Sequence, residues 1–407
     1  MKIQNKILIF HGYYLLLSMI LRETMLQVLI KEFPAVVILG PRQVGKSTLA
    51  KQIAAKGKRP VAYIDMEQAS DRRKVDDPET FFFENRDKLV IIDEIQQKPE
   101  LFTALRPEID AFRKPGRFIL TGSASLHLIK GASESLAGRL AYMPLTPFNL
   151  TEVVGQKYLL QRHWFRGGFP EAFLAKNDDT FHRWMENYIT SFVQRDLQMM
   201  FDVNLSPEVI RTLWSMLSNN SGGVLNIENY ARAIGITGPT VKRYMGFLEG
   251  AFLVRQLPPW FANSNKRLVK SPKIYIRDSG LLHHLTGVAK PADLIGNIIV
   301  GASWEGYVIE EICRHLPSLV QPYFYKTHHG AEADLILVKN NKPVASIEIK
   351  HSKAPTLSEG FYNVVEDLST EKNYIIYTGT EKYKTKNNVT VIGLEDFIRK
   401  ELKTIIK

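Results

Sequence analysis

Ala35-Val36-Val37-Ile38-Leu39 runs directly into Gly40-Pro41-Arg42-Gln43-Val44-Gly45-Lys46-Ser47, and this stretch decides the fold of the N-terminal part of the chain. Its first five residues form a continuous apolar run, which is typical of a strand buried on both faces of a sheet. The rest follows the pattern G-x-x-x-x-G-K-S, between that strand and an expected helix. In such a loop, backbone N–H groups and the helix N-terminus face phosphate oxygens. The stretch therefore predicts a nucleotide-binding α/β domain.

Individual residues of this loop have specific expected roles. Lys46 reaches the β and γ phosphates, and Ser47 is a ligand of magnesium. We therefore expect ATP and Mg2+ as cofactors. The residues expected to bind the nucleotide are Gly40, Pro41, Arg42, Gln43, Val44, Gly45, Lys46, Ser47 and Thr48.

A second apolar run, Leu89 to Ile92, ends in the carboxylates Asp93 and Glu94. Asp93 is expected to hold the magnesium shell, and Glu94 to orient or deprotonate the attacking water. The alternative is that both carboxylates only cap the following helix. Because the acidic strand end and the loop occur together in the order that the mechanism needs, we expect hydrolysis of ATP.

Two further polar residues are candidates for the same site. Ser123 follows the expected strand Phe118 to Thr121, where it either contacts the γ-phosphate or the water, or is a turn residue. Arg139 either stabilises charge during hydrolysis or is a solvated surface residue. The spacing between these strands and Val61 to Asp65 leaves room for crossover helices, as in a parallel sheet.

Residues from about Met19 to Leu150 resemble the ATPases associated with diverse activities, in a prokaryotic branch with the same Gly-Pro-Arg-Gln-Val-Gly-Lys-Ser loop. Leu136 to Arg139, Arg166 to Glu171 and Ile276 to Leu281 resemble further segments of that family, whose C-terminal half carries a domain of unknown function. The resemblance implies the nucleotide residues Lys46, Ser47, Asp93 and Glu94, with Ser123 in the sensor position. It implies no particular biological substrate.

The middle of the chain is basic. The whole chain of 407 residues has 53 Lys and Arg against 42 Asp and Glu, a net charge of +11. This balance favours a polyanionic partner, and nucleic acid is the first candidate. The basic residues that gather in the middle are Arg232, Lys242, Arg243, Arg255, Lys266, Arg267, Lys270 and Lys273.

The same region has the spacing of a helix-turn-helix. Asn226 to Ile234 predicts one helix, Gly235 to Gly238 a turn, and Pro239 to Leu248 a second helix. The strand-like run Phe252 to Arg255 suggests a winged variant. Such a unit binds DNA when its second helix enters the major groove, but it also serves as a protein-contact module. The side chains expected to point outward are Thr240, Lys242 and Arg243.

Near the C-terminus, Glu332 to Val338 and Val344 to Lys350 predict two adjacent strands joined by a turn. Side chains alternate along a strand, so Glu348 and Lys350 share one face, and Asp334 of the partner strand can meet them. Two carboxylates hold a magnesium ion and a lysine positions or activates water in metal-assisted phosphodiester cleavage. The expected metal ligands here are Asp334 and Glu348.

This arrangement resembles the restriction-endonuclease-like fold through its Asp…Glu-x-Lys signature at Asp334, Glu348 and Lys350. The resemblance implies a further carboxylate on the preceding helix, which is Glu305 or alternatively Glu310 or Glu311. Ala333 stands where many relatives have proline, and the Gln-x-x-x-Tyr element of one nuclease branch is absent. The alternative is an exposed hairpin whose Glu and Lys pair across solvent without chemistry.

The sequence predicts an α/β protein built from several domains. The expected parts are an extension over 1–18 with translation starting at Met1 or Met19, an AAA-type P-loop ATPase domain over 19–150, a helical lid over 151–205, a winged helix-turn-helix over 206–290 and a restriction-endonuclease-like α/β domain over 300–407.

We expect a cytoplasmic ATPase that binds DNA and has a magnesium-dependent nuclease site. A non-cutting, ATP-dependent regulatory or interaction switch is the main alternative, and a polypeptide remodeller is the third. A homo-oligomer and a protein partner both fit the sequence. The longest apolar stretch, Ile7 to Leu21, is interrupted by polar residues and falls short of the roughly 20 residues of a membrane span, so no membrane partner is expected.

Overall fold

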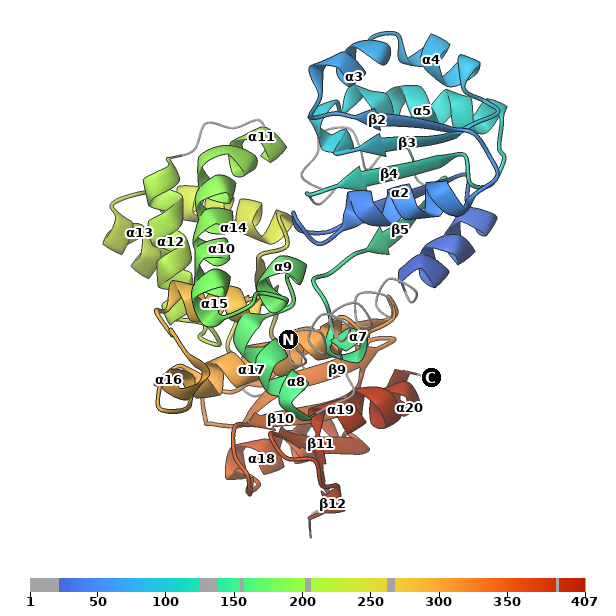
Figure 1. Cartoon of the computed structure of the whole chain (residues 1–407). Helices are drawn as coiled ribbons and strands as arrows, with labels where there is room; N and C mark the ends of the chain where they lie inside the picture. The colour runs from blue at the N-terminus through green and yellow to red at the C-terminus, as the bar shows by residue number, and fades with distance from the viewer. Residues whose placement is uncertain are drawn as a thin grey trace, which may run out of the picture.

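The structure is a computed structural model that describes residues 22–124, 136, 138–153, 157–201, 206–261, 268–385 and 388–406. The extension predicted for residues 1–18, both candidate start residues and the basic pair Lys266 and Arg267 lie outside the described residues. Figure 1 shows one sheet with helices in the N-terminal part, a group of helices in the middle part and a second sheet in the C-terminal part. Within the described ranges, no helix is long and apolar enough to cross a lipid bilayer.

The N-terminal part is built on a parallel sheet with the strand order β2-β3-β4-β1-β5. Its strands are β1 (Ala35–Leu39), β2 (Val61–Asp65), β3 (Leu89–Asp93), β4 (Phe118–Gly122) and β5 (Leu140–Pro144). The four strands expected from the sequence are present. Strand β5 was not expected from the sequence: its apolar run Leu140 to Met143 is short and ends in proline, and Tyr142 is exposed at this edge of the sheet.

Helices cover both faces of this sheet (Figure 1). They are a helix over residues 22–32, α2 (Lys46–Lys56), α3 (Ala69–Lys74), α4 (Pro78–Glu84), the 3-10 turn η1 (Ile95–Gln97) and α5 (Glu100–Ala111). Successive side chains of β1 point to opposite faces. Val36 and Ile38 are in one buried cluster with Leu49 of α2, whereas Val37 is in another with Phe102 of α5. The central strand is therefore apolar throughout.

The middle part is mainly helical. Its elements are α7 (Leu150–Val153), α8 (Lys157–Arg166), α9 (Pro170–Phe173), α10 (Asp178–Ser191), the π-helical turn η3 (Phe192–Asp196), α11 (Leu197–Phe201), α12 (Pro207–Asn219), α13 (Ile227–Ile234), α14 (Gly238–Gly250), β6 (Val254–Leu257), β7 (Lys273–Ile276), α15 (Ser279–Leu285) and α16 (Pro291–Ile295). Within the helical lid expected over 151–205, residues 178–201 form the continuous run α10, η3 and α11.

The expected helix pair is present as α13 and α14. The Asn226 side chain accepts a hydrogen bond from the N–H of Asn229 and caps α13, which ends at Gly235 with a φ of 78°. Thr237 caps α14, and Pro239 lies in its first turn. The second helix therefore begins at Gly238 and extends to Gly250, slightly beyond both expected ends.

Strands β6 and β7 pair antiparallel, but the chain next to them contacts the C-terminal sheet. The Trp260 N–H donates to the Phe324 carbonyl at 2.7 Å, and the Val269 N–H donates to the Lys326 carbonyl at 3.1 Å. The segments on both sides of residues 262–267 thus cover the edge of that sheet. Here the structure differs from a free wing, because backbone pairing with a later domain leaves no pattern in the local sequence.

The C-terminal part has a mixed sheet with the order β12-β13-β11-β10-β9-β8. Its elements are α17 (Val300–Cys313), β8 (Val320–Lys326), β9 (Glu332–Lys339), β10 (Lys342–Lys350), α18 (Glu359–Leu368), β11 (Lys372–Tyr377), β12 (Tyr383–Lys384), β13 (Thr390–Gly393), α19 (Leu394–Asp396), the π-helical turn η4 (Phe397–Glu401) and α20 (Leu402–Ile406). Strands β8, β9 and β10 are antiparallel, and β10, β11 and β13 are parallel.

The expected antiparallel pair is present as β9 and β10, in register Leu335 to Ile347. The sequence also predicts a last strand at Tyr374 to Tyr377; this strand is present within β11, but β12 and β13 follow it, so it is not the last. Strand β13 has only 4 residues, which is too short for a periodicity to show.

Candidate functional site

The loop between β1 and α2 is shaped by two glycines. A Cβ on Gly40 would lie 1.9 Å from the Leu145 carbonyl oxygen, so any other residue would push β1 away from the following segment. Gly45 has a φ of 95°, a backbone conformation that favours glycine. Gly45 is also the N-cap of α2, and no side chain accepts a hydrogen bond from the first N–H groups of that helix. The N-terminal N–H groups of α2 therefore face the loop, as in sites that bind phosphate.

Lys46 is only 4% exposed and lies inside this loop. Its Nζ donates to the carbonyls of Gly40 at 3.1 Å and Pro41 at 2.9 Å, and to Ser123 Oγ at 2.7 Å. Burial lowers the pKa of Lys46, although the nearby carboxylates of Glu94 and Asp93 oppose this shift. The ammonium group is thus held at the mouth of the loop beside the end of β3.

Ser47 and Asp93, the two expected magnesium ligands, are in direct contact. Ser47 Oγ donates to Asp93 Oδ1 at 2.9 Å. Thr121 Oγ1 also donates to Asp93, and so does the Tyr63 hydroxyl at 2.5 Å. A hydroxyl and a carboxylate oxygen are suitable ligands for Mg2+, so these residues fit that ion. The sequence analysis did not single out Tyr63 and Thr121, although a polar side chain in an apolar strand was a visible signal.

Glu94 leaves the strand in an unusual conformation, with a φ of 55°. Ser123 Oγ donates to Glu94 Oε1 at 2.7 Å, and Gln96 donates to the other carboxylate oxygen. Ser123 therefore lies between Lys46 and Glu94 and contacts both, while its contact with the γ-phosphate or the water stays a prediction. A strained backbone that aims a carboxylate at a site is often functional.

Arg42 connects the loop to the middle helices. Its guanidinium donates to Asp196, the last residue of the π-helical turn η3, and to Glu67. Burial opposes a charged Arg42, but the contacts with Asp196 prevail and raise the pKa of Arg42. In this structure the Arg42 guanidinium therefore binds two carboxylates next to the nucleotide loop.

Arg139 does not reach the loop. It precedes Leu140, which pairs with Ala35 at the start of β1, whereas Gly40 follows the other end of β1. Its Nε and Nη2 each lie 2.7 Å from a carboxylate oxygen of Asp110. Parallel strands put Arg139 at the end of β5 opposite the nucleotide loop, so it does not contact the loop of its own chain.

Two segments that carry the family resemblance, Arg166 to Glu171 and Ile276 to Leu281, pack against each other. Asp278 Oδ2 accepts a hydrogen bond from the Gly168 N–H at 2.8 Å. A Cβ on Gly167 would lie 2.0 Å from Asp278 Oδ1, and a Cβ on Gly280 would lie 2.1 Å from the Arg166 carbonyl. The glycines are therefore needed for close approach of the two segments.

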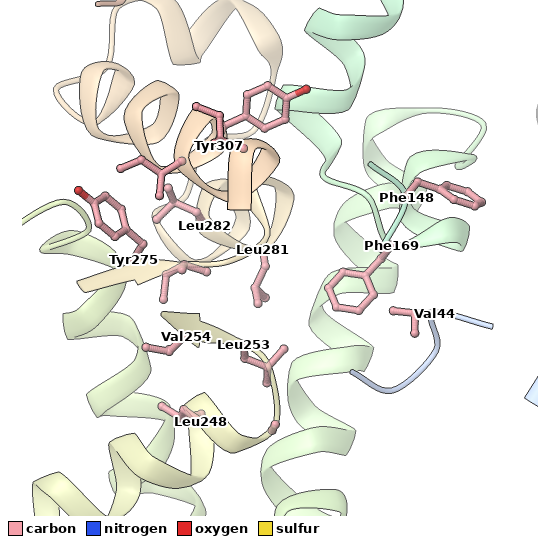
Figure 2. Close-up of a cluster of buried hydrophobic side chains, with 14 of the residues drawn as sticks. Val44, Phe148, Phe169, Leu248, Leu253, Val254, Tyr275, Leu281, Leu282 and Tyr307 are labelled. Atoms are coloured by element: carbon pink, nitrogen blue, oxygen red, sulfur yellow. The ribbon is translucent and has the colours of Figure 1, made fainter. Parts of the chain in front are cut away.

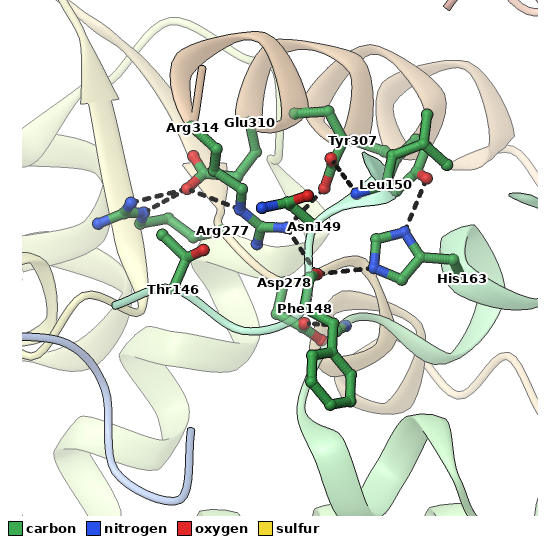
Figure 3. Close-up of polar contacts among 12 residues, drawn as sticks. Thr146, Phe148, Asn149, Leu150, His163, Arg277, Asp278, Tyr307, Glu310 and Arg314 are labelled. Carbon is green, nitrogen blue, oxygen red and sulfur yellow. Dashed lines mark hydrogen bonds and ion pairs between the residues drawn. The ribbon is translucent and has the colours of Figure 1, made fainter. Parts of the chain in front are cut away.

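Next to these segments lies a network of charges, which we call the interdomain network: Arg255, Arg277, Glu310, Glu311 and Arg314. The two glutamates are buried and the three arginines are half-buried. Figure 3 shows Arg277, Glu310 and Arg314. Glu310 contacts Arg255 and Arg277, both at 2.7 Å. Glu311 binds Arg314 at 2.5 Å and accepts the Leu150 N–H at 2.7 Å. Burial opposes ionisation of Glu310, but the arginines prevail and lower its pKa.

The network excludes three expected roles. Glu310 and Glu311 bind arginines and a backbone N–H, so neither is the helix carboxylate of the predicted nuclease site. Arg255 binds Glu310 and is not available for DNA phosphates.

A small cavity of about 110 Å³ separates the network from Gly40 and Pro41 of the nucleotide loop. Figure 2 shows Val44 of that loop beside Phe169.

The expected nuclease residues do converge in the C-terminal part. Asp334 Oδ2 on β9 accepts the Ile349 N–H of β10 at 2.8 Å. Glu348 Oε1 accepts Lys350 Nζ at 2.7 Å and Ser358 Oγ at 2.6 Å. Burial and the neighbouring Glu305 raise the pKa of Asp334. The structure therefore brings Asp334, Glu348 and Lys350 to the end of β10.

A residue that the sequence placed in the DNA-binding surface lies at the same site. Lys273 Nζ is 3.1 Å from Glu305, 3.1 Å from Glu332 and 3.6 Å from Asp334. Burial opposes a charged Lys273, but these three carboxylates prevail and raise its pKa. Within the described residues, no group of three or more His, Cys, Asp or Glu side chains has a geometry that could hold a metal ion.

The parallel sheet, the glycine-rich loop and the acidic end of β3 define a P-loop ATPase of the AAA class. Residues 32–154 match the AAA domain family, 157–292 match a domain of unknown function (DUF8612), and 300–397 match another (DUF4143). Uncharacterized proteins of Mycobacterium tuberculosis and Mycobacterium bovis are each 35% identical over 368 residues, which cover 90% of this chain and 81% of theirs. The chain belongs to this family of AAA-type ATPases with a C-terminal DUF4143 domain.

The chain is also similar to parts of solved structures. A Walker-type ATPase of Pyrococcus abyssi, PABY2304, is 16% identical with a TM-score of 0.45, over 65% of this chain and 94% of that one. A RuvB mutant of Thermotoga maritima is 15% identical with a TM-score of 0.31, over 58% of this chain and 89% of that one.

Proposed function

We propose that this ATPase binds DNA with its middle part and uses ATP hydrolysis to control a magnesium-dependent nuclease site in its C-terminal part. The observation that carries the proposal is the convergence of Asp334, Glu348 and Lys350 in a chain that also has a complete P-loop site. DNA is the substrate that connects a basic helix pair to a phosphodiester-cleaving site.

In the ATPase part, Lys46 holds the β and γ phosphates, while Ser47 and Asp93 are the ligands of magnesium. When bound, Mg2+ neutralises charge on the phosphates. Glu94 accepts the proton of the attacking water, and Ser123 keeps the Glu94 carboxylate turned toward the phosphates. The 2.7 Å contact between Ser123 and Glu94 supports this assignment.

For DNA binding, the winged-helix order of α12, α13, α14, β6 and β7 supports a role for α14 as the helix that enters the groove. Lys242 and Arg243 lie exposed on its first half and can neutralise phosphates. Arg255 and Lys273 bind carboxylates of the same chain, so the proposed surface is smaller than the sequence suggested.

In the nuclease part, Asp334 and Glu348 hold the metal and Lys350 positions the attacking water. Glu348 Oε2 is buried and has no hydrogen-bond partner in the described part of the chain, which supports a role as a cation ligand. When bound, Mg2+ polarises the scissile phosphate. Glu305 is the remaining helix carboxylate, since Glu310 and Glu311 bind arginines.

A specific observation favours a second candidate, a non-cutting ATP-dependent switch. Lys273 already supplies a positive charge to Glu305, Glu332 and Asp334. A C-terminal part with this internal cation could bind DNA or protein without cutting. The interdomain network would then transmit the state of the ATPase site.

The two candidates differ in one assay. Purified protein is incubated with single-stranded, duplex and branched DNA in the presence of Mg2+, next to an Asp334→Ala variant, and ATP hydrolysis is measured with and without DNA at two salt concentrations. Cleavage that Asp334→Ala abolishes supports the nuclease. DNA-stimulated hydrolysis without cleavage of any substrate supports a switch that acts on DNA, and the absence of both cleavage and stimulation contradicts any role on DNA.

A further inference from the structure

Lys273 is a residue of the middle part whose ammonium group lies among carboxylates of the C-terminal part. Its Nζ is 3.1 Å from Glu305 of α17, 3.1 Å from Glu332 of β9 and 3.6 Å from Asp334 of β9. The side chain is 5% exposed, so water screens these contacts little. One cation therefore bridges three anions from two elements.

The backbone holds Lys273 in this place. Its strand β7 pairs with β6, and the segments that flank residues 262–267 pair with the edge strand β8. The neighbouring Tyr275 hydroxyl donates to Glu305 at 2.5 Å, so two side chains of β7 bind one carboxylate. The ammonium position is thus a consequence of how the middle part packs on the C-terminal sheet.

We call Glu305, Glu332, Asp334 and Glu348 the carboxylate cluster. Two further lysines bind carboxylates of this cluster. Lys326 Nζ lies 2.6 Å from Glu332, and Lys350 Nζ lies 2.7 Å from Glu348. Glu348 Oε2 is buried without a hydrogen-bond partner among the described residues. Buried carboxylates need a cation partner, and an oxygen with none points to a ligand beyond Lys273.

An ammonium group and a divalent metal ion satisfy the same oxygens but exclude each other. Lys273 Nζ lies 3.6 Å from the proposed metal ligand Asp334 and 3.1 Å from Glu305, so its charge repels a metal ion that Asp334 would bind.

We propose that Lys273 is a built-in competitor of the divalent cation, so that packing of the middle part on the C-terminal part keeps the carboxylate cluster closed to metal. This inference rests on the proposed nuclease function, because it describes the regulation of that same site. It assigns to β7 the role of an internal inhibitor. The cluster opens to a metal ion only when the Lys273 side chain leaves it.

The test measures binding of Mn2+ to the full-length protein by electron paramagnetic resonance, without added ATP. Lys273→Met keeps the length of the side chain and removes the charge. We expect Lys273→Met to bind one Mn2+ at least about tenfold more tightly than wild type, and Lys273→Met with Asp334→Asn to lose this gain. Lys353→Met, which changes an exposed lysine just after β10, is the matched control and should behave as wild type.

Equal Mn2+ affinity in wild type and Lys273→Met overturns the inference, as does a gain that Asp334→Asn leaves unchanged. If Lys273→Met binds Mn2+ but cuts no DNA, the inference stands and the nuclease function falls. If wild type cuts DNA with Mn2+ while its Lys273 stays in the cluster, the nuclease function stands and the inference falls.

A measurement on wild type covers the case in which the variant does not fold. Amine-reactive labelling followed by mass spectrometry reports the exposure of the Lys273 ammonium. We expect slow labelling of Lys273 without Mn2+ and faster labelling as Mn2+ is raised to millimolar levels, with Lys353 labelled at a constant rate. Saturable Mn2+ binding at the cluster with Lys273 still protected contradicts the inference.

Discussion

At the scale of single residues, the ATPase site depends on how Glu94 is presented. The backbone of Glu94 is in the left-handed region, directly after β3. Ser123 Oγ donates a hydrogen bond to the Glu94 carboxylate at 2.7 Å and accepts one from Lys46 Nζ. The three side chains form one connected group, so a change in one alters the orientation of the others. Testing Glu94 therefore requires a substitution that keeps its shape.

Glu94→Gln keeps the shape and one hydrogen-bond acceptor but removes the proton acceptor. We expect ATP binding close to wild type and a rate of hydrolysis lower by about 100-fold or more. Equilibrium nucleotide binding and steady-state phosphate release measure the two effects separately. Lys46→Ala is the contrasting variant and should lose both. Hydrolysis at the wild-type rate in Glu94→Gln would show that another group activates the water.

The sequence predicted the positions of this site where the residues are contiguous. Lys46, Ser47, Asp93 and Glu94 belong to short motifs, and the structure brings them together. Asp196 could not be predicted as a partner of Arg42, because the two residues are 154 positions apart and contact only through the packing of η3. The roles of the motif residues Lys46, Ser47, Asp93 and Glu94 in hydrolysis stay predictions until they are measured.

Lys273 shows the same limit in the other half of the molecule. Its charge was visible in the sequence, but a basic residue in a basic region favours a surface position. Only the pairing of β7 and of its flanking segments turns this side chain toward Glu305 and Asp334. Charge alone does not distinguish a lysine that binds DNA from one that binds carboxylates of its own chain.

At the scale of elements, the helices α8, α15 and α17 are joined by buried histidines. His283 of α15 contacts the Phe165 carbonyl at 2.8 Å and Ser303 Oγ of α17 at 2.6 Å. Burial lowers the pKa of His283 to about 4. Likewise, burial lowers the pKa of His163 of α8, which contacts the Tyr307 hydroxyl of α17 at 2.8 Å.

These histidines predict a loss of stability in mild acid. The pKa of His283 is about 4 in the folded chain against an ordinary value of 6.5, so the unfolded chain binds more protons between these pH values. The stabilising contribution is fully present above pH 6.5 and is lost as the pH falls toward 4, by about 3 kcal/mol. Urea unfolding at several pH values measures this loss.

The variant that isolates this effect is His283→Gln, which does not titrate. We expect a smaller change of stability between pH 7 and pH 5 than in wild type, whereas His329→Gln, at an exposed position, should keep the wild-type slope. An unchanged slope in His283→Gln would assign the acid sensitivity to other groups.

Helix α14 carries the proposed contact with DNA phosphates. Replacing both Lys242 and Arg243 by alanine should weaken DNA binding to all sequences alike, since phosphate contacts carry no base information. The slope of log affinity against log salt should fall by about 1.8, which is about 0.9 for each lost contact. Fluorescence anisotropy at several salt concentrations measures both. Arg232→Ala on α13 is the comparison, and an unchanged slope in the double variant would remove α14 from the DNA surface.

The elements themselves were predictable where they are long and periodic. The strands β1 to β4, the helices α13 and α14 and the pair β9 and β10 follow from apolar runs and capping residues. Strands β12 and β13 are short, and β5 is as long as β1 but lies at the sheet edge with an exposed Tyr142, so each is stabilised by neighbours in the sheet rather than by its own pattern. Tertiary pairing of this kind leaves no local signal.

At the scale of the whole molecule, the interdomain network is where the three parts meet. Arg255 and Arg277 come from β6 and the segment after β7, Glu310 comes from α17, and the cavity beside them reaches Gly40 of the nucleotide loop. Because Glu310 is buried and binds two arginines, its charge fixes the middle part on the C-terminal part. The same packing places Lys273 in the carboxylate cluster. A change at Glu310 should therefore affect both the packing of the middle part on the C-terminal part and the position of Lys273.

Glu310→Gln removes the charge and leaves the half-buried Arg255 and Arg277 without their anion. We expect a loss of about 2–3 kcal/mol in the free energy of unfolding, below the cost of a fully buried unpaired charge because water reaches part of both arginines. Glu371→Gln, at an exposed position between α18 and β11, should change stability by less than about 0.5 kcal/mol. Limited proteolysis should cut Glu310→Gln first between the middle and C-terminal parts, around residues 286–300. A variant as stable and as resistant as wild type would mean that the apolar contacts between the parts, and not these charges, hold them together.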